Sequence, residues 1–392
     1  MSDVPGLERV LSAAGPPLAS APPTGEGDPG RFAALFGRDS LIVSLQLLPV
    51  RPDVARATLR ALAVHQGRRE DPETEEEPGK ILHERWERAP ARLAAVGWPV
   101  REGGITYYGS VDSTPWFLVV LAALADAALA AELEPAWRAA GTWLRRALVR
   151  GGGLLRHGPG TAGGGLGQQG WRDTSDPLGS ADGGGIVTGD GSAPPAPLAD
   201  ADSQAAAIAG LRGLARLSGD ERDLRTARAL AARVEERFGP ETIAIDARER
   251  DVLGAGSWLG WLLWAGLPAE RYAERLVAPD VLTPWGLRTL SADHPQFRPD
   301  AYHRGSVWPF DSWLGWGGLR GAGLDTDAAR VRAGVLEAIE RLGGWPELYA
   351  VGAAGPEPIA IANRVQGWTV GAAWALGNEW DGRLAPREVG MG

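Results

Sequence analysis

Residues 202–238 have the sequence DSQAAAIAGLRGLARLSGDERDLRTARALAARVEERF. On both sides of the Ser218-Gly219-Asp220 turn, apolar residues recur at intervals of three and four, and this spacing predicts two helices, Asp202–Leu217 and Glu221–Phe238. The short turn between them favours a hairpin in which the second helix packs against the first. We expect this helical hairpin to be the structural unit of the fold.

The same periodicity recurs along the rest of the chain. It predicts further helices at Leu41–Leu48, Asp53–His65, Thr114–Ala131, Glu134–Val149, Gly256–Ala265, Pro268–Leu276, Gly305–Gly318, Asp325–Leu342 and Ile359–Leu376. Strand signals are confined to Ile105–Tyr108 and Thr242–Ile245. An all-α chain with most helices in adjacent pairs predicts a six-hairpin toroid, the (α/α)6 barrel, with an inner ring inside an outer ring and a cleft at one end. An irregular helical solenoid is the alternative, although the sequence has no fixed-period repeat.

The composition limits the chemistry that this chain can perform. It has 392 residues, no Cys and a formal net charge of −9, from 40 basic and 49 acidic residues. The lack of Cys excludes disulfide scaffolds, thiol nucleophiles and Cys-based zinc sites, and the negative charge argues against binding to nucleic acid. No apolar run reaches the ~18 residues of a membrane span, so we expect no membrane partner. The 17 Trp residues favour sugar binding, because a flat indole suits the apolar face of a sugar ring.

Two segments lie outside the helical pattern. Residues 1–30 are rich in Pro, Gly, Ala and Ser and lack the basic and apolar regions of a signal peptide, so we expect a flexible tail and a cytoplasmic protein. Residues 31–385 are then expected to form one catalytic domain. Within it, Gly151–Pro197 is Gly-rich and far longer than an ordinary loop, and we expect it to be a functional loop at the cleft end of the barrel.

Carboxylates beside Trp are the strongest chemical signal. None of the His residues has the spacing of a zinc site, and no Ser lies in a nucleophile elbow, so we expect neither a metal nor another cofactor. In contrast, Asp173 and Asp176 follow Trp171, and Glu347 follows Trp345. Hydrolysis of a glycosidic bond needs one carboxylic acid to protonate the leaving oxygen and a second carboxylate to activate water or attack carbon. The alternative, from these residues alone, is that both Asp side chains are ordinary loop or cap residues.

Longer motifs carry a family resemblance. They are Leu35–Leu41, Glu76–Glu84, Tyr107–Pro115, Gly170–Asp176, Tyr302–Pro309 and Trp345–Tyr349. In these motifs and in their order, the sequence resembles the amylo-α-1,6-glucosidase-like family, the catalytic half of glycogen debranching enzymes. It is more distantly similar to glucoamylase and mannosylglycerate hydrolase type glycosidases. The resemblance implies an (α/α)6 barrel and an inverting α-glycosidase that acts on a carbohydrate substrate without a cofactor.

The resemblance also implies roles for individual residues. Asp173 corresponds to the general acid, with Asp176 as the alternative, and Glu347 corresponds to the general base. In an inverting enzyme these two carboxyls should lie roughly 6.5–9.5 Å apart. The expected substrate-binding residues are Arg38, Asp39, Lys80, His83, Glu84, Tyr108, Asp112, Trp171, Arg172, His303, Arg304 and Trp308.

Some of these residues have a structural alternative. Arg38 and Asp39 could form an ion pair at the start of a helix, and Asp112 could cap the helix that follows it. Lys80, the only Lys in the chain, could be a structural tie to the acidic run before it.

The sequence departs from the family pattern in three respects. Full-length members carry an N-terminal β-rich domain, which we do not expect here. Residues 257–261 read Ser-Trp-Leu-Gly-Trp where the family has Ser-Asn-Pro-Gly-His, and Phe310 replaces a His. We therefore expect hydrolysis of small α-glucosides, with α-1,6 or related linkages, rather than of glycogen. The alternatives are a hydrolase of glucosylglycerate or mannosylglycerate and a non-catalytic carbohydrate-binding relative.

Overall fold

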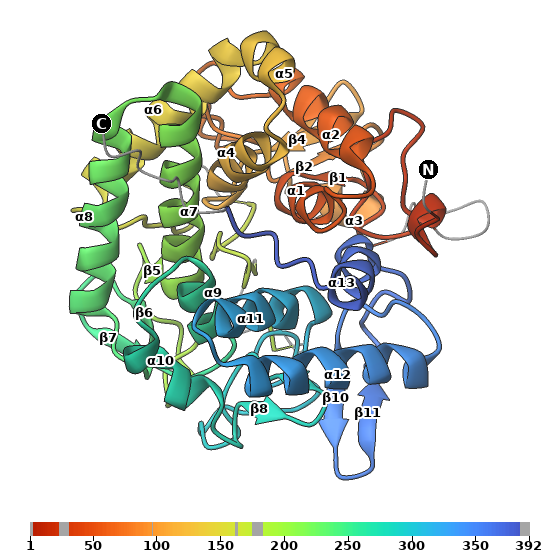
Figure 1. The fold of residues 1–392 in the computed structure, drawn as a ribbon. Coiled ribbons are helices and arrows are strands. Elements are labelled where there is room, and N and C mark those ends of the chain that lie inside the picture. Colours follow the sequence, from red (N-terminus) through yellow and green to blue (C-terminus); the bar gives the residue numbers. More distant parts are fainter. Residues whose placement is uncertain (1–2, 23–30, 96, 161–163, 175–182, 385–392) are drawn as a thin grey trace.

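The fold is built around a ring of helices. The computed structural model describes residues 3–22, 31–95, 97–160, 164–174 and 183–384. The ring helices are α1 (Gly37–Gln46), α4 (Ser113–Leu124), α7 (Ala201–Ser218), α9 (Trp258–Trp264), α11 (Pro309–Gly321) and α13 (Gly367–Gly377). Within the described ranges, each of these six helices packs on the next, and α13 returns to α1 (Figure 1). The ring is therefore closed, which rules out an open solenoid.

A second layer of helices surrounds this ring (Figure 1). It contains α2 (Pro52–Val64), α6 (Glu134–Arg150), α8 (Glu221–Arg237), α10 (Ala269–Leu276) and α12 (Asp325–Leu342). Each of them packs on one or two ring helices, and α7 and α8 form the hairpin predicted from residues 202–238. All ten residues of α1 are buried, whereas α8 buries a narrow face. This difference follows from position, because a ring helix is surrounded by protein and an outer helix needs only one apolar stripe.

Short antiparallel strands lie in the connections. One sheet has the order β1-β2-β4-β3 and contains β1 (Leu35–Phe36), β2 (Glu84–Trp86), β3 (Val100–Arg101) and β4 (Gly104–Tyr107). The smaller sheets contain β5 (Ala199–Asp200), β6 (Thr242–Ile245) and β7 (Asp251–Leu253), then β8 (Leu282–Thr283) with β9 (Gly286–Leu287), and β10 (Tyr349–Gly352) with β11 (Gly355–Pro358). Of the two predicted strands, one corresponds to β4 and the other has the same bounds as β6.

Most predicted helices differ from the structure by a few residues at their ends, and two differ more. The segment Thr114–Ala131 is divided between α4 and a short helix α5 (Ala127–Glu132), because Ala125 adopts a left-handed φ of 52° and Asp126 caps the new helix. The segment Ile359–Leu376 is helical only from Gly367 onward. The remaining short helices are α3 (Ala91–Ala95) and the 3₁₀ helix η1 (Leu7–Arg9). The largely helical architecture predicted from the sequence is confirmed.

The N-terminal segment differs from the flexible tail that we expected. Where it is described, at residues 3–22, it packs on the barrel: Val4, Leu7 and Val10 are buried in the main apolar core. The Pro17 carbonyl also accepts a hydrogen bond of 2.7 Å from the Ser40 hydroxyl of α1. The sequence interpretation gave weight to Pro and Gly and overlooked these apolar side chains, whose burial offsets the entropy cost of ordering the segment.

The C-terminal residues 378–384 cross the end of the ring where the ring helices finish. The indole N–H groups of Trp264 and Trp313, late in α9 and within α11, donate to the carbonyls of Asp381 and Trp380. The Trp380 indole in turn donates to the Leu45 carbonyl in the last turn of α1. These bonds cover one end of the ring and leave the opposite end for the site described below. Among the described residues, no helix has the length and apolar character needed to span a membrane.

Candidate active site

The first residues of the ring helices meet at one end of the ring. Arg38 and Asp39 begin α1, Trp308 precedes α11, and Gln366 precedes α13, and all four line one cavity. Because each helix N-terminus carries a partial positive charge, this end of the ring favours carboxylates and other anions.

The cavity is small and strongly aromatic. It is lined by Ala19, Phe32, Phe36, Arg38, Asp39, Trp171, Asp173, Tyr302, His303, Trp308, Glu347, Gln366 and Trp368. About 30 Å³ of it is open to the centres of water molecules. Both proposed catalytic carboxyls, Asp173 and Glu347, therefore share one cavity.

Asp173 is held by Arg38 and remains accessible from the cavity. The Arg38 Nη2 atom donates to Asp173 Oδ2, and Arg38 Nη1 donates to Asp112 at 3.1 Å and to the Gly170 carbonyl at 3.1 Å. The Asp173 side chain keeps 23% exposure, against 3% for Arg38. Burial raises the pKa of Asp173 to about 6, and the Arg38 charge opposes that rise. A carboxyl with such a pKa is partly protonated near neutral pH, as a general acid requires. Asp176, the alternative acid, lies outside the described residues.

Glu347 is held by donors on both carboxylate oxygens. The Tyr302 hydroxyl donates to Oε1, and Oε2 accepts from the backbone N–H and the side-chain amide of Asn363, each at 3.0 Å. Burial raises the pKa of Glu347 above its ordinary value, while the Asn363 and Tyr302 hydrogen bonds lower it. Donors of this kind stabilise the ionised form, which is the form that a general base needs.

A third carboxyl, Asp39, lines the same cavity. Burial raises the pKa of Asp39 to about 7, with Arg38 acting against the rise and the charges of Asp173 and Glu347 adding to it. Three carboxyls around one small cavity cannot all be ionised without repulsion, so some of them hold protons near neutral pH. Among the described residues, no His, Asp and Glu side chains are grouped as ligands for a metal ion.

Aromatic rings form the wall of the cavity. Trp171 makes edge contacts with His303 and Trp308, at centroid distances of 5.2 and 5.4 Å. His303 accepts a hydrogen bond from the Gly185 N–H at Nδ1, and burial together with nearby arginines holds its pKa well below the ordinary value. The neutral ring therefore carries its proton on Nε2, which leaves that nitrogen as a hydrogen-bond donor. Trp171, His303 and Trp308 are thus brought together as expected.

Trp261 and Phe310, two residues at which the sequence departs from the family pattern, lie directly behind this wall. The Trp261 ring is stacked on Trp171 at 6.0 Å with an interplanar angle of 8°. Phe310 packs edge-on against Trp171 at 5.2 Å and is stacked on Trp368 at 4.1 Å. Neither Trp261 nor Phe310 lines the cavity, so these residues support its wall rather than contact a ligand.

Arg172 was expected to bind substrate, but its side chain is turned away from the cavity. Its guanidinium is buried against Asp202 and lines, with His303 and Arg304, a separate pocket behind the wall. Arg304 donates to the Gly183 carbonyl at 3.0 Å in the same region. The structure therefore places Arg172 and Arg304 beside the site rather than in it.

Other expected substrate-binding residues support the site from a distance. Asp112 is buried and pairs with Arg38, so its role is neither the cap that we considered nor cavity lining. Lys80 is buried near Glu77 at 3.5 Å, which agrees with the structural tie considered as its alternative. Neither His83 nor Glu84 lines the cavity; the His83 ring packs edge-on against Phe36, and burial raises the pKa of Glu84 to about 8.

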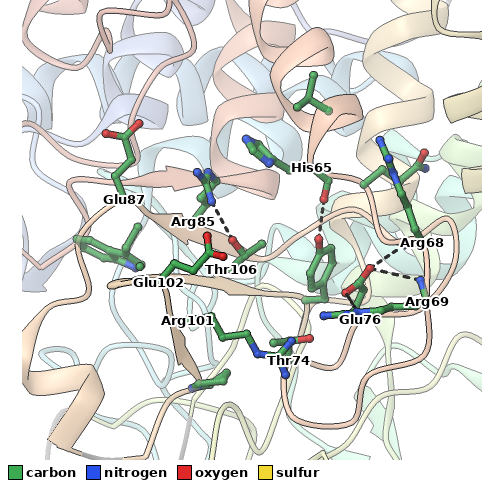
Figure 2. Close-up of a pocket in the computed structure, with 16 residues that line it drawn as sticks. His65, Arg68, Arg69, Thr74, Glu76, Arg85, Glu87, Arg101, Glu102 and Thr106 are labelled. Atoms are coloured by element: carbon green, nitrogen blue, oxygen red, sulfur yellow. Dashed lines mark hydrogen bonds and ion pairs between the residues drawn. The ribbon is translucent and has the colours of Figure 1, made fainter.

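Tyr108 lies in a different hollow, which we call the charged cleft. Figure 2 shows this cleft between the end of α2 and the sheet β2-β4-β3, with its side chains pointing into open space. The Tyr108 hydroxyl donates to the His65 carbonyl at 2.7 Å, so this tyrosine joins the loop to the helix end rather than facing Asp173.

Sequence reasoning missed several residues of the cavity. Tyr302 and Phe36 lie inside the Tyr302–Pro309 and Leu35–Leu41 motifs but were not expected in the site. Asn363 and Gln366 lie in no motif. Asn363 reaches Glu347 only because the chain returns after the β10–β11 hairpin.

Comparisons with known proteins agree with the fold. A family model described as the mannosylglycerate hydrolase MGH1-like glycoside hydrolase domain matches residues 196–350. The crystal structure of a GH63 mannosylglycerate hydrolase from Thermus thermophilus, in complex with Tris and D-glycerate, is similar with a TM-score of 0.67 and 18% identity, over 94% of this chain and 97% of that chain. A structure of that hydrolase in complex with glucose has a TM-score of 0.65 and 19% identity, over 94% of this chain and 97% of that chain. No curated protein matches the sequence significantly.

A further solved structure, named as a wild-type glycosidase, has a TM-score of 0.55 and 16% identity over 96% of this chain and 95% of that chain. At such identities the structural likeness establishes the fold. The resemblance to glycosidases inferred from the motifs is confirmed: the chain shares its fold with these glycosidases, and its residues 196–350 match the MGH1-like glycoside hydrolase model.

Proposed function

We propose that this protein is a single-domain (α/α)6-barrel glycoside hydrolase that cleaves an α-glycosidic bond with inversion. Asp173 is the general acid and Glu347 the general base. The observation that carries the proposal is their shared cavity: one carboxyl has a pKa of about 6 and stays accessible, and the other is fixed by Tyr302 and Asn363.

The reaction follows from these two environments. The Asp173 carboxyl gives its proton to the glycosidic oxygen as the bond from that oxygen to the anomeric carbon breaks. A water molecule attacks the same carbon from the opposite face and passes a proton to the Glu347 carboxylate. The products are the free sugar, with inverted configuration, and the alcohol of the aglycone. Proton exchange with water restores both carboxyls.

The aromatic and polar lining of the cavity favours a sugar ring as the bound group. Its wall of Trp171, Trp308 and Trp368 suits one sugar ring, and Arg38, Asp39 and His303 offer polar groups for the sugar hydroxyls. We therefore propose a small α-glucoside as the substrate class.

A second candidate is a glycoside of glyceric acid. Arg31 lies over the Tyr302 ring at 5.1 Å, and its charge acts on both Asp173 and Glu347. A cation at this place suits an aglycone that carries a carboxylate. The MGH1-like family match supports the same candidate.

A release assay separates the candidates. The purified protein is incubated with maltose, isomaltose, panose, glycogen, glucosylglycerate and mannosylglycerate, and the released sugar is measured. Release from the neutral disaccharides supports the first candidate, and release only from the glycerate glycosides supports the second. Release from none of the six contradicts the proposal and favours a carbohydrate-binding protein without activity.

The stereochemistry is tested separately. Proton NMR during the first minutes of hydrolysis identifies the anomer that forms first. We expect the β-anomer from an α-glycoside, and an α-anomer would exclude the acid–base pair in the form proposed here.

A further inference from the structure

A buried cluster lies directly behind the proposed general acid. In the segment Trp171–Asp173, the first and third side chains line the cavity, while the Arg172 side chain runs into the protein. Its guanidinium donates to Asp202 Oδ2 at 2.9 Å, to the Ser257 hydroxyl at 3.1 Å and to the Thr289 carbonyl at 3.0 Å. Asp202 lies in the first turn of α7 and Ser257 precedes α9, so Arg172 joins the acid-bearing loop to two ring helices.

The cluster is dry and extends to the wall of the cavity. The side chains of Arg172 and Asp202 are 2% and 1% exposed. Ser257 also lowers the pKa of Asp311, and Asp311 accepts a hydrogen bond of 2.6 Å from the Trp261 indole. Because Trp261 is stacked on Trp171, the cluster contacts the loop at two residues, Arg172 and Trp171.

The charges of the cluster are balanced by protonation. One guanidinium faces two carboxyls, and Asp202 Oδ1 and Asp311 Oδ2 are buried without a hydrogen-bond partner. Burial raises the pKa of Asp202 to about 7 and that of Asp311 above its ordinary value. A proton on one of the two carboxyls leaves a single ion pair, which is the arrangement that a dry interior tolerates.

Such an anchor matters because a general acid works only at hydrogen-bond distance from the leaving oxygen. The Asp173 side chain is hydrogen-bonded to Arg38, but the loop that precedes it is rich in Gly and includes Gly170. The neighbouring residue, Arg172, makes three hydrogen bonds to distant parts of the chain, two of them at the starts of ring helices. A shift of about 1 Å in a reacting group can cost on the order of 10²-fold in rate.

We propose that Arg172, paired with Asp202, is a positioning residue that holds the Asp173 carboxyl in reach of the leaving-group oxygen. The inference rests on the proposed function, in which Asp173 is the general acid. It replaces the substrate-binding role that the sequence suggested for Arg172.

The test compares two leaving groups on the same enzyme. The substrates are the dinitrophenyl and methyl α-glycosides of the sugar released in the assay above. Dinitrophenolate departs without a proton, whereas methanol must be protonated as it leaves. For Arg172→Lys and Asp202→Asn, we expect kcat/KM to fall roughly 10- to 10²-fold with the methyl glycoside and less than about 3-fold with the dinitrophenyl glycoside.

This ratio is insensitive to partial misfolding, because a smaller active fraction lowers both rates equally. Equal losses with both substrates, or no loss with either, would overturn the inference. Asp223→Asn is the matched control: Asp223 is also buried and paired with an arginine, Arg145 at 2.7 Å, but it lies in the outer helix α8. It should leave the ratio unchanged, and a changed ratio would also count against the inference.

Asp173→Asn separates this inference from the proposed function. It should show the same preference for the dinitrophenyl glycoside, and more strongly. If Asp173→Asn lacks that preference, the general-acid assignment is wrong. If Asp173→Asn shows it and both cluster variants do not, only the role of Arg172 is wrong.

Discussion

The enclosed cavity and the charged cleft place similar residue types in opposite surroundings. The cleft is far larger, with about 390 Å³ open to the centres of water molecules against about 30 Å³ in the cavity (Figure 2). At the cleft, Arg101, whose side chain is 42% exposed, pairs with Asp71 and lowers the pKa of that carboxyl. In the cavity, burial raises the pKa of Asp39 and Asp173 although Arg38 is nearby. Burial rather than the size of a hollow therefore marks the site where acid–base chemistry is favoured.

The largest expected effect is the loss of the base. Glu347→Gln keeps the side-chain shape but cannot accept a proton from water, so kcat should fall about 10²- to 10⁴-fold. Initial rates on the substrate found in the release assay measure this loss. Glu76→Gln, in the charged cleft, is the control and should keep the wild-type rate. A similar loss in both variants would remove the distinction between the two regions.

The second prediction concerns pH. The proposed acid must be protonated, and because the pKa of Asp173 is about 6, kcat/KM should fall about tenfold per pH unit above that value. The base must be ionised, and because the pKa of Glu347 lies above its ordinary 4.5, the rate should also fall on the acid side. A pH–rate profile of the wild type and Asp173→Asn checks both limbs. The alkaline limb should disappear in the variant, and its persistence would assign it to another group.

A smaller effect is expected behind the cavity wall. Trp261→Phe removes the indole donor of Asp311 in a dry interior and should lower the free energy of unfolding by about 1–3 kcal/mol. Urea denaturation measures the change. The matched control is Trp137→Phe in the outer helix α6, which removes a partly buried hydrogen bond to the Ala130 carbonyl. It should lower the free energy of unfolding by less. Equal costs would show that the cluster behind Trp171 contributes no more than an outer-layer contact.

The smallest effect belongs to the charged cleft. Arg69 is 64% exposed and pairs with Asp71 and Glu76. Because surface ion pairs contribute little, Arg69→Ala should change the free energy of unfolding by less than about 1 kcal/mol and leave the hydrolysis rate unchanged. Thermal melting and the release assay test both expectations. A large loss of activity would make the cleft part of the catalytic site.

Much of the site was predictable because its residues lie in short motifs, Arg38 and Asp39 at the start of α1 and Asp173 and Glu347 in loops. Asp173, Glu347, Arg38 and Asp39 were all expected from the sequence, and the structure brings them to one cavity. The partners of Glu347 were not predictable. Tyr302 and Asn363 reach it across separations of 45 and 16 residues, which helical periodicity does not encode.

The Trp residues show the same limit. Their number suggested sugar binding, yet Trp116, Trp258 and Trp313 are fully buried in the core of the barrel. Only Trp171, Trp308 and Trp368 among the described Trp residues line the cavity. Composition records how many large rings must be buried, but packing decides which of them face a ligand.

The sequence by itself determined the helical hairpins, because apolar spacing specifies which face of each helix is buried. It also placed Asp173 and Glu347 each two residues after a Trp along the chain. Only the tertiary structure decided that Arg172 turns into the protein while Asp173 turns into the cavity. Neighbouring residues in a loop have no periodicity to fix their directions, and a guanidinium enters a dry interior only where acceptors such as Asp202 and Ser257 are supplied by other parts of the chain.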